Sequence, residues 1–353
     1  MRRGLLNWSK EELPEAVFDA RVQRLREAMH ERGLDAVLVY TNFPRPAGVA
    51  HLTHFVPYWN QCVLAVLPVG LPSLIVSLSK RVAGWIMETS HVHEVICSPN
   101  IGGELCRLLE GAAARRIGMV ELDKTPRPII SALLEADAGY QITDATGLFA
   151  SVRNPADEAE IMLSRKAAEM AADALAGAVE GDGDPDLAAI ERDIRYAGAE
   201  DVFMDIAPDL TRDPNYIRAD RPMRLGARYA IRLSVAYNGT WIRYGRSFER
   251  DGNSDAVAAI SDYLAAAIPA LGDGADLKPL AAHADALSPL QWDGVIIEGC
   301  TGCAPLQLLP NPPAGAVVSL GFTFRDERGH WLVDEPAVLS TGGANPAARL
   351  TRS

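Results

Sequence analysis

One segment near the middle of the chain divides it into two parts. Residues 151–181 are SVRNPADEAEIMLSRKAAEMAADALAGAVEG, in which Asn154 can cap a helix and Pro155 suits the first helical position. The acidic residues that follow favour a helix N-terminus, because they face its partial positive charge. A long helix is therefore predicted here. Since 353 residues exceed what one hydrophobic core usually organises, we expect a first domain over residues 1–152 and a second over residues 153–353.

The two parts differ in how helical and strand patterns follow one another. In the first part, a helical spacing over residues 14–32 is followed by DAVLVY, which is typical of a buried strand. Short apolar runs then alternate with helical segments up to about residue 150, which predicts a layered α/β domain. After its two leading helices, the second part is rich in strand patterns with one long helical stretch inserted at residues 254–270. We expect an α+β domain there.

Charge and hydropathy exclude several classes of function. The formal net charge is −12 at pH 7, which disfavours nucleic acid or an anionic membrane surface as a partner. The most apolar window, residues 62–78, contains Pro68, Gly70 and Pro72. These residues predict two strands around a turn and not a membrane helix. A soluble protein with a small-molecule or protein partner is expected.

The cysteines point to a reducing compartment. The chain has five, an odd number, and its N-terminal segment has no cleavable apolar core. We therefore expect reduced thiols in a cytoplasmic protein. Cys300 and Cys303 form a C-x-x-C pair, which supplies only half of a structural zinc site. Cys300 is a candidate nucleophile, because nearby arginines would lower the pKa of its thiol, although no base is evident beside it.

Five segments, in order along the chain, resemble the family that includes creatinase, prolidase and aminopeptidase P. They are GVAHLTHF (residues 48–55), RNPADEAEIMLSRKAAEMA, the stretch of residues 213–248, PPAGAVVSLGFTF and VDEPAVLSTGG. Together they cover nearly the whole chain. The resemblance implies an N-terminal creatinase-like α/β domain followed by a C-terminal α+β domain of the pita-bread type. It also implies a homodimer.

In that family, a hydrolytic site holds two divalent ions with an Asp on each of two adjacent strands, a His and two Glu. Several carboxylates and an imidazole are needed because two hard cations lie close together. The resemblance assigns Arg232 and Arg243 to the two Asp positions, Cys300 to the His position, Gly321 to the first Glu position and Glu335, with Asp334 beside it, to the last.

Arginines at two ligand positions argue against a metal centre. A guanidinium group stays protonated and has no lone pair to donate, so no bound metal and no cofactor are expected. Arg232 and Arg243, with Arg246 nearby, instead suggest a cleft that binds a carboxylate or phosphate. The alternative is that these arginines pair with buried acids. The acids considered are Asp205, Asp334 and Glu335.

Two further groups of residues are candidates for substrate contact. Asn215 stands where the family has a substrate-contacting His. His51, His54, Tyr58 and Trp59 belong to the densest polar and aromatic cluster in the sequence. In creatinase-like dimers, the N-terminal domain of one subunit overhangs the cleft of the other, so this cluster could line a substrate cavity. A packed contact between domains or subunits is the alternative.

These observations leave three functions open. We expect a metal-independent hydrolase or lyase of the creatinase or aminopeptidase type, acting on a small carboxylate-bearing substrate, with Glu335, Asp334 and Cys300 as candidate catalytic residues. A catalytically inactive pita-bread protein that serves as a binding or assembly module is the alternative. A metal-dependent Xaa-Pro peptidase is weaker, because the second part shows no suitable Asp pair on adjacent strands.

Overall fold

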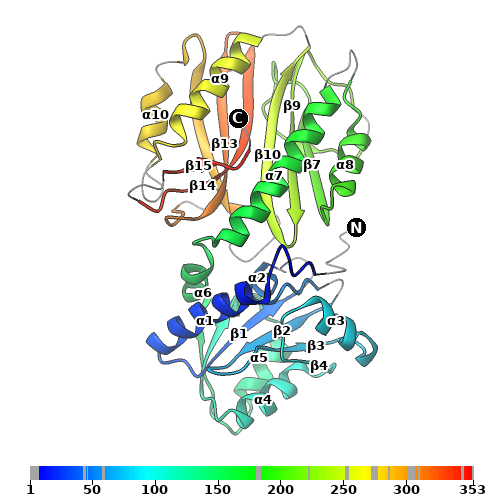
Figure 1. Ribbon diagram of the computed structural model, residues 1–353, viewed down its shortest axis with the longest axis vertical. Helices are drawn as coiled ribbons and strands as arrows, with labels where there is room; N and C mark the ends of the chain where they lie inside the picture. The colour runs from blue at the N-terminus through cyan, green and yellow to red at the C-terminus, as the bar shows by residue number, and fades with distance from the viewer. Residues whose placement is uncertain are drawn as a thin grey trace. The chain divides into compact units, whose positions relative to one another are not determined.

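The chain folds into two compact units, shown in the computed structural model of Figure 1. Among the described residues, one unit ends at Arg153 and the other begins at Asn154. The structure describes residues 8–42, 45, 47–57, 60–179, 184–221, 223–250, 254–271, 277–284, 287–299, 307–308, 311–342 and 346–351. Within them, no helix combines the length and the apolar character needed to span a lipid bilayer.

The N-terminal unit is a six-stranded mixed sheet in the order β4-β3-β2-β1-β5-β6. Its strands are β1 (Ala36–Thr41), β2 (Cys62–Val66), β3 (Ser73–Val76), β4 (Glu94–Cys97), β5 (Arg116–Val120) and β6 (Gln141–Asp144). Its helices are α1 (Glu15–Glu31), α2 (Ala47–Thr53), α3 (Ala83–Thr89), α4 (Ile101–Gly111), α5 (Arg127–Leu134) and α6 (Thr146–Arg153). The pairs β1–β2 and β2–β3 are antiparallel, and the others are parallel.

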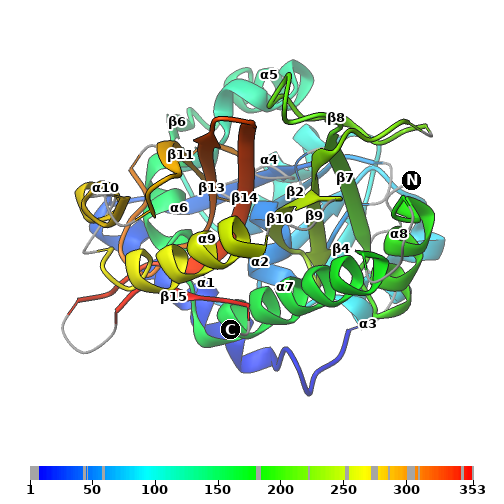
Figure 2. The same ribbon diagram turned by 90° about the horizontal axis from the view of Figure 1, so that it is seen from above.

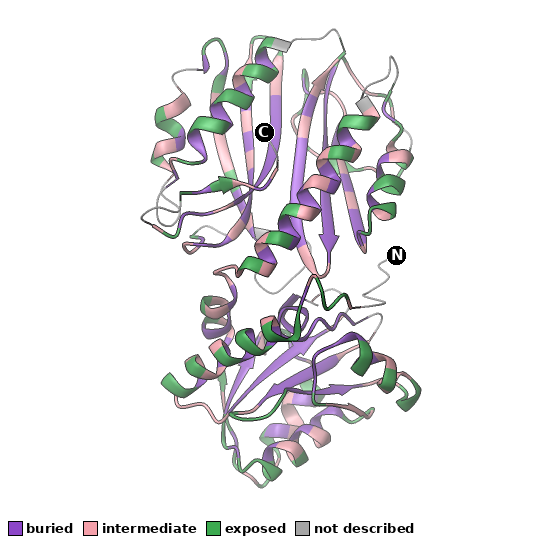
Figure 3. Cartoon of the chain, in the orientation of Figure 1, coloured by how far each residue is buried: buried purple, intermediate pink, exposed green. Residues whose placement is uncertain are grey.

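Helices cover both faces of this sheet, which explains why its central strand is buried throughout. Alternate residues of a strand point to opposite faces. In β1, Val37 and Val39 pack in a cluster with side chains from α1, α2, α3 and α6, whereas Ala36 and Leu38 pack with α4 and α5. The central strands are accordingly buried, as Figure 3 shows. The predicted α/β layering of this part is confirmed.

The C-terminal unit is built on a nine-stranded sheet in the order β12-β11-β13-β14-β10-β9-β7-β8, with β15 paired to β14. Its strands are β7 (Asp201–Ala207), β8 (Ile217–Arg218), β9 (Arg228–Tyr237), β10 (Thr240–Glu249), β11 (Gln291–Gly299), β12 (Gln307–Leu308), β13 (Val317–Asp326), β14 (Gly329–Val338) and β15 (Ala348–Arg349). Its helices are α7 (Glu158–Val179), α8 (Leu187–Tyr196), α9 (Ser254–Ala267) and α10 (Lys278–Ala284).

This sheet consists of two halves that meet at one seam. The hairpins β9–β10 and β13–β14 are each paired along their whole length. Between β10 and β14, which join the halves, the register contains one pair, Gly245 with Asp334. The seam therefore depends on side chains as well as on backbone pairing.

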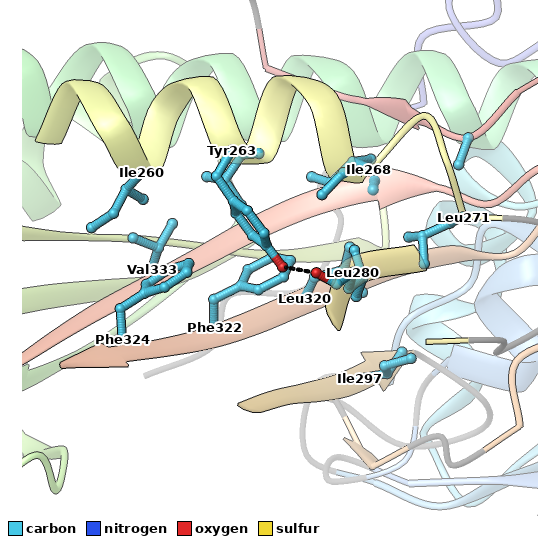
Figure 4. Packing of buried hydrophobic residues seen from close by; sticks show 14 of the residues in the cluster. Ile260, Tyr263, Ile268, Leu271, Leu280, Ile297, Leu320, Phe322, Phe324 and Val333 are labelled. Atoms are coloured by element: carbon cyan, nitrogen blue, oxygen red, sulfur yellow. Dashed lines mark hydrogen bonds between the residues drawn. The ribbon is translucent and has the colours of Figure 1, made fainter. Parts of the chain in front are cut away.

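One face of the C-terminal sheet is covered by helices, and α7 and α9 lie along it in Figure 2. Tyr263 of α9 stands edge-on to Phe322 and Phe324 of β13, with ring centroids 6.0 and 5.4 Å away. Its hydroxyl donates to the Leu280 carbonyl of α10 at 3.0 Å, so one side chain fastens both helices to the sheet (Figure 4).

A buried arginine connects the two hairpins at one end of the sheet. Arg228 is fully buried. Its two terminal nitrogens each donate to Asp326 at 2.9 Å, and one of them also donates to Glu249 at 3.1 Å. Its guanidinium carbon lies 4.1 Å from the centre of the Trp331 ring. Burial alone would raise the pKa of Asp326, but the hydrogen bonds that it accepts, first from Arg228, lower that pKa to about 2.

Replacing Arg228 should destabilise this unit strongly. Arg228→Met leaves two carboxylates without their buried cation, and we expect the free energy of unfolding to fall by about 3–5 kcal/mol. Urea denaturation followed by circular dichroism measures it. Arg325→Met is the matched control, because Arg325 is half-exposed and pairs with Asp293 at 3.2 Å; about 1 kcal/mol or less is expected there. Equal losses in the two variants would contradict the structural role of Arg228.

Candidate functional site

A polar row crosses the face of the C-terminal sheet opposite to α9. Directly paired residues on neighbouring strands share a face, and the register aligns Asp205, Arg232, Gly245, Asp334 and Gly321. The neighbouring residue of β14, Glu335, is paired with Leu320, which packs in the core beneath α9. The polar row therefore points away from that core. Charged groups concentrated on one side of a sheet mark it as a candidate site.

Asp334 occupies the centre of this row at the seam. A Cβ atom added at Gly245 would lie 2.6 Å from Asp334 Oδ2, and one added at Gly321 would lie 3.2 Å from Oδ1. The carboxyl group thus extends over strands on both sides where no side chain stands. Glycine is required at Gly245 for this close approach, since any larger residue would displace the carboxyl group.

The Asp334 carboxyl group is buried and has an uncharged partner. Its exposed fraction is 4%, and the Tyr216 hydroxyl donates to Oδ2 at 3.2 Å. No described residue makes a salt bridge to it. Burial raises the pKa of Asp334 above its ordinary value, although Arg232 and Arg243 act in the opposite direction. Burial and the Asp334 carboxyl group also raise the pKa of Tyr216 well above its ordinary value, so the phenol stays protonated.

Arg232 is held between an acid and an aromatic ring. Its Nη2 donates to Asp205 Oδ2 at 3.1 Å, and its guanidinium carbon lies 4.0 Å from the centre of the Tyr216 ring. Burial opposes the charged form, but Asp334, Tyr216 and Asp205 outweigh it and raise the pKa of the guanidinium. Arg232 is thus a permanent positive charge within this face.

Arg243 is the more enclosed of the two arginines. Its Nε donates to Ser234 Oγ at 3.1 Å, and its Nη1 pairs with Glu298 of β11. Its main-chain N–H donates to Ser319 Oγ at 2.9 Å. Only 8% of its side chain is exposed. Both arginines are therefore engaged with acids inside the protein. Asp205 is one of the acids considered in the sequence; Glu298 is not.

Glu335 lies on the opposite face and belongs to a separate network. It is fully buried and pairs with Arg246 of β10. Arg349 of β15 donates to it at 3.1 and 3.4 Å, and the Thr351 hydroxyl donates as well. Burial alone would raise the pKa of Glu335, but the two arginines lower it below its ordinary value. Arg246 also donates to the Asp334 carbonyl at 3.0 Å, so it clamps the seam.

The placement of the last family position is therefore corrected by one residue. Glu335 was aligned with the positions of Arg232, Arg243 and Gly321, but strand alternation turns its side chain away from them. Asp334 is the carboxylate that shares their face. Arg246 likewise lies with Glu335 on the helix-covered side. The sheet brings together Asp334, Arg232 and Arg243, and it separates them from Glu335 and Arg246.

Comparison with known proteins identifies the fold of this chain. Residues 21–154 match the family model of the Creatinase/Prolidase N-terminal domain. An X-Pro aminopeptidase from Thermotoga maritima superposes with a TM-score of 0.72 at 15% identity, over 94% of this chain and 97% of that one. The chain has the creatinase/prolidase fold. No significant match is found among curated proteins.

Two further solved structures support the same fold. A Xaa-Pro dipeptidase from Bacillus anthracis superposes with a TM-score of 0.69 at 16% identity, over 95% and 98% of the two chains. A prolidase from Pyrococcus furiosus does so with a TM-score of 0.69 at 16% identity, over 94% and 99%. The predicted resemblance and fold class are confirmed. At such identities, these likenesses concern the fold and not the activity.

The family resemblance of the sequence implies two divalent ions, and the residues that stand at their ligand positions do not fit them. Arg232 and Arg243 stand where the resemblance places two Asp ligands, and neither can donate a lone pair. Asp205 and Glu298 are each bound to an arginine. Among the described residues, no group of three or more His, Cys, Asp and Glu side chains is arranged to hold a metal ion. The described residues of this face offer the chemistry of acids, arginines and a tyrosine.

The structure describes three of the other candidates from the sequence, Asn215, His51 and His54. Asn215 is exposed and its amide donates to Asp213 at 2.7 Å. His51 and His54 are buried within the described residues, and His54 Nδ1 lies 3.0 Å from the Thr89 carbonyl oxygen. Burial and nearby arginines, first Arg21, lower the pKa of His51 well below its ordinary value. Tyr58, Trp59, Cys300 and Cys303 lie outside the described residues.

Sequence reasoning missed Tyr216, the hydrogen-bond donor to Asp334. Tyr216 directly follows Asn215, in the segment that was matched to the family's substrate-contacting motif. Only the three-dimensional arrangement shows that its hydroxyl reaches the carboxyl group of a residue more than a hundred positions later. Sequence reasoning also missed Glu298, the partner of Arg243.

Neutralising the two adjacent acids should have opposite consequences for stability. Glu335→Gln leaves Arg246 and Arg349 without their buried anion and should lower the free energy of unfolding at pH 7 by about 3–5 kcal/mol. Asp334→Asn removes a charge that burial disfavours and should change it by less than about 1 kcal/mol, or raise it. Urea denaturation of both variants and the wild type measures these values.

The pH dependence follows from the two shifts. The folded state lowers the pKa of Glu335. Ionised Glu335 therefore stabilises the fold above its unfolded-state pKa, near 4.5, and this stabilisation is lost as the pH falls below that value. The folded state raises the pKa of Asp334, so its contribution to stability has the opposite pH dependence and is lost as the pH rises. The penalty of Glu335→Gln should therefore shrink between pH 5 and pH 3. A penalty that stays constant over this range would contradict the ion-pair network.

Proposed function

We propose that this protein is a metal-independent enzyme of the creatinase/prolidase fold, a hydrolase or lyase that acts on a C–N bond in a small carboxylate-bearing substrate. The observation that carries the proposal is the Asp334 carboxyl group, which is buried at the seam, hydrogen-bonded to Tyr216 and in no salt bridge with a described cation. Beside it on the same face, Arg232 supplies positive charge for the substrate carboxylate.

The chemistry assigns one role to each group. Cleavage of a C–N bond needs a proton on the departing nitrogen, and a carboxyl group whose pKa is raised by burial is suited to donate it. In hydrolysis, Asp334 gives its proton to nitrogen, water adds hydroxide to carbon, and the water's remaining proton restores Asp334. Tyr216, which stays protonated, holds the carboxyl group in position throughout.

A catalytically inactive binding module is the second candidate, and one observation favours it. Arg232 pairs with Asp205 and Arg243 pairs with Glu298, so both guanidinium groups are occupied when no ligand is bound. A network of that kind can persist without any substrate. A homodimer and a cytoplasmic location, both expected from the sequence, stay part of the proposal; light scattering of the purified protein checks the dimer.

One purified sample tests the proposed function. Protein prepared without chelators or a histidine tag should contain well below one transition-metal equivalent per chain by elemental mass spectrometry. It should also cleave at least one member of a panel of N-substituted amino acids and dipeptides with unchanged rate in EDTA. Asp334→Asn should lower kcat by roughly a hundredfold or more with KM little changed, because it removes a proton donor. Arg325→Met should leave kcat and KM unchanged, because Arg325 lies far from this row in the register.

The outcomes separate the three functions. Two equivalents of manganese, zinc or cobalt with EDTA-sensitive peptidase activity would contradict metal independence and support an ordinary peptidase. Metal-free protein that binds a carboxylate from the panel without turning it over would support the binding module. Turnover that survives Asp334→Asn would remove Asp334 from the mechanism.

A further inference from the structure

A second arginine, Arg218, meets Arg232 at the outer edge of the polar row. The register pairs Asp205 of β7 with Arg218 of β8 on one side and with Arg232 of β9 on the other. Arg218 Nε lies 3.4 Å from Asp205 Oδ1, and Arg232 Nη2 lies 3.1 Å from Oδ2. One carboxylate thus serves two guanidinium groups. The three side chains together carry a net charge of one positive unit.

Aromatic rings hold both guanidinium groups in place. The guanidinium carbon of Arg218 lies 4.7 Å from the centre of the Phe203 ring, and that of Arg232 lies 4.0 Å from Tyr216. Phe203 is itself stacked on Trp241, with centroids 5.5 Å apart and planes at 12°. Stacking fixes the plane of a guanidinium group without using its N–H donors. The two forks are therefore preorganised while donors remain for a ligand.

The donors that remain are identifiable. Arg232 Nε is buried and has no hydrogen-bond acceptor among the described residues. Arg218 keeps about half of its side chain exposed, at 49%, and its described ion pair uses Nε alone. A buried donor without a partner is costly unless a ligand or water satisfies it. The edge of the row thus combines an excess positive charge, an unsatisfied donor and an accessible fork.

We propose that Arg218 and Arg232 together form the carboxylate-binding subsite of this protein, with Asp205 as the anion that holds them in register. The inference rests on the proposed function and deepens it, because it moves the anchor for the substrate carboxylate away from Arg243 and Arg246. The buried Asp334 carboxyl group also acts on Arg232, and it repels a dianion more than a monoanion, which favours a carboxylate over a phosphate dianion.

The position of the subsite also limits the substrate. Arg232 and Asp334 stand two strands apart in one row, so about 10 Å separates their strand backbones. Gly245 lies between them and contributes no side chain, and the Asp334 carboxyl group extends over it. The Tyr216 phenol connects the two residues, with its ring against Arg232 and its hydroxyl on Asp334. If Arg218 and Arg232 bind the carboxylate of a substrate, a C–N bond a few atoms along the substrate from that carboxylate would lie beside Asp334. The size is that of an N-substituted amino acid or a dipeptide.

Anion titration of the full-length protein tests the subsite. Acetate and inorganic phosphate are titrated at low ionic strength while the arginine Nε–Hε signals are followed by NMR. We expect acetate to shift the Arg232 signal and to bind more tightly than phosphate. Arg218→Gln should weaken acetate binding by roughly tenfold, and Asp205→Asn should strengthen it, because the anion that competes for both forks is neutralised.

The control is Arg212→Gln, which removes the same charge from a side chain that is 84% exposed and pairs with Asp209 at 3.4 Å. Equal weakening by Arg218→Gln and Arg212→Gln would overturn the subsite, since only general electrostatics would then be at work. Tighter binding of phosphate would overturn the carboxylate assignment. If Asp205→Asn unfolds the protein, the Arg218→Gln result still decides, because Arg218 is half-exposed.

The two proposals can fail separately. Metal-free, Asp334-dependent turnover with a KM unaffected by Arg218→Gln would overturn the subsite and leave the proposed function standing. Acetate binding that depends on Arg218 in a protein without turnover would support the subsite and overturn the enzymatic role. Absence of acetate binding in the wild type would overturn the subsite.

Discussion

The pairing of Arg246 with Glu335 across the seam is the interaction on which the C-terminal unit depends. Backbone pairing between its two halves is confined to Gly245 and Asp334. Arg246 adds an ion pair to Glu335 and a hydrogen bond to the Asp334 carbonyl. Arg349 and Thr351 then bring the C-terminal segment onto the same carboxylate. Because Glu335 is fully buried, its negative charge is stable only when these partners surround it. Their positions therefore hold β14 against β10 and β15.

Strand alternation gives two neighbouring acids opposite chemistry. Glu335 points to the helix-covered side, where arginines keep its pKa low, and Asp334 points to the other side, where burial raises its pKa. The same β14 backbone holds both. The structural role of Glu335 therefore positions Asp334, and a proton donor can be placed at the seam without loosening the sheet. Glu335 thus has a structural role and Asp334 a proposed chemical one, although they are neighbours on one strand.

The positive charges of Arg232 and Arg243 are balanced by acids on neighbouring strands. Arg232 is balanced by Asp205 and Arg243 by Glu298, while glycines at Gly245 and Gly321 leave room for the Asp334 carboxyl group. Buried arginines without partners would be too costly to retain. The sharing of Asp205 between Arg218 and Arg232 leaves one positive charge over, and that surplus is the reason to expect an anion at this edge.

The sequence by itself determined the layered α/β pattern of the first unit and the long helix near the start of the second, because strand periodicity and capping patterns are local properties. Five segments in order carried the resemblance to the creatinase and prolidase family. The sequence did not determine which of two adjacent acids faces the site, since a shift of one residue reverses the face of a strand. Tyr216, Glu298 and Arg218 reach their partners only when distant strands pair. The tertiary structure alone decided those contacts, because sequence carries no register between strands far apart in the chain.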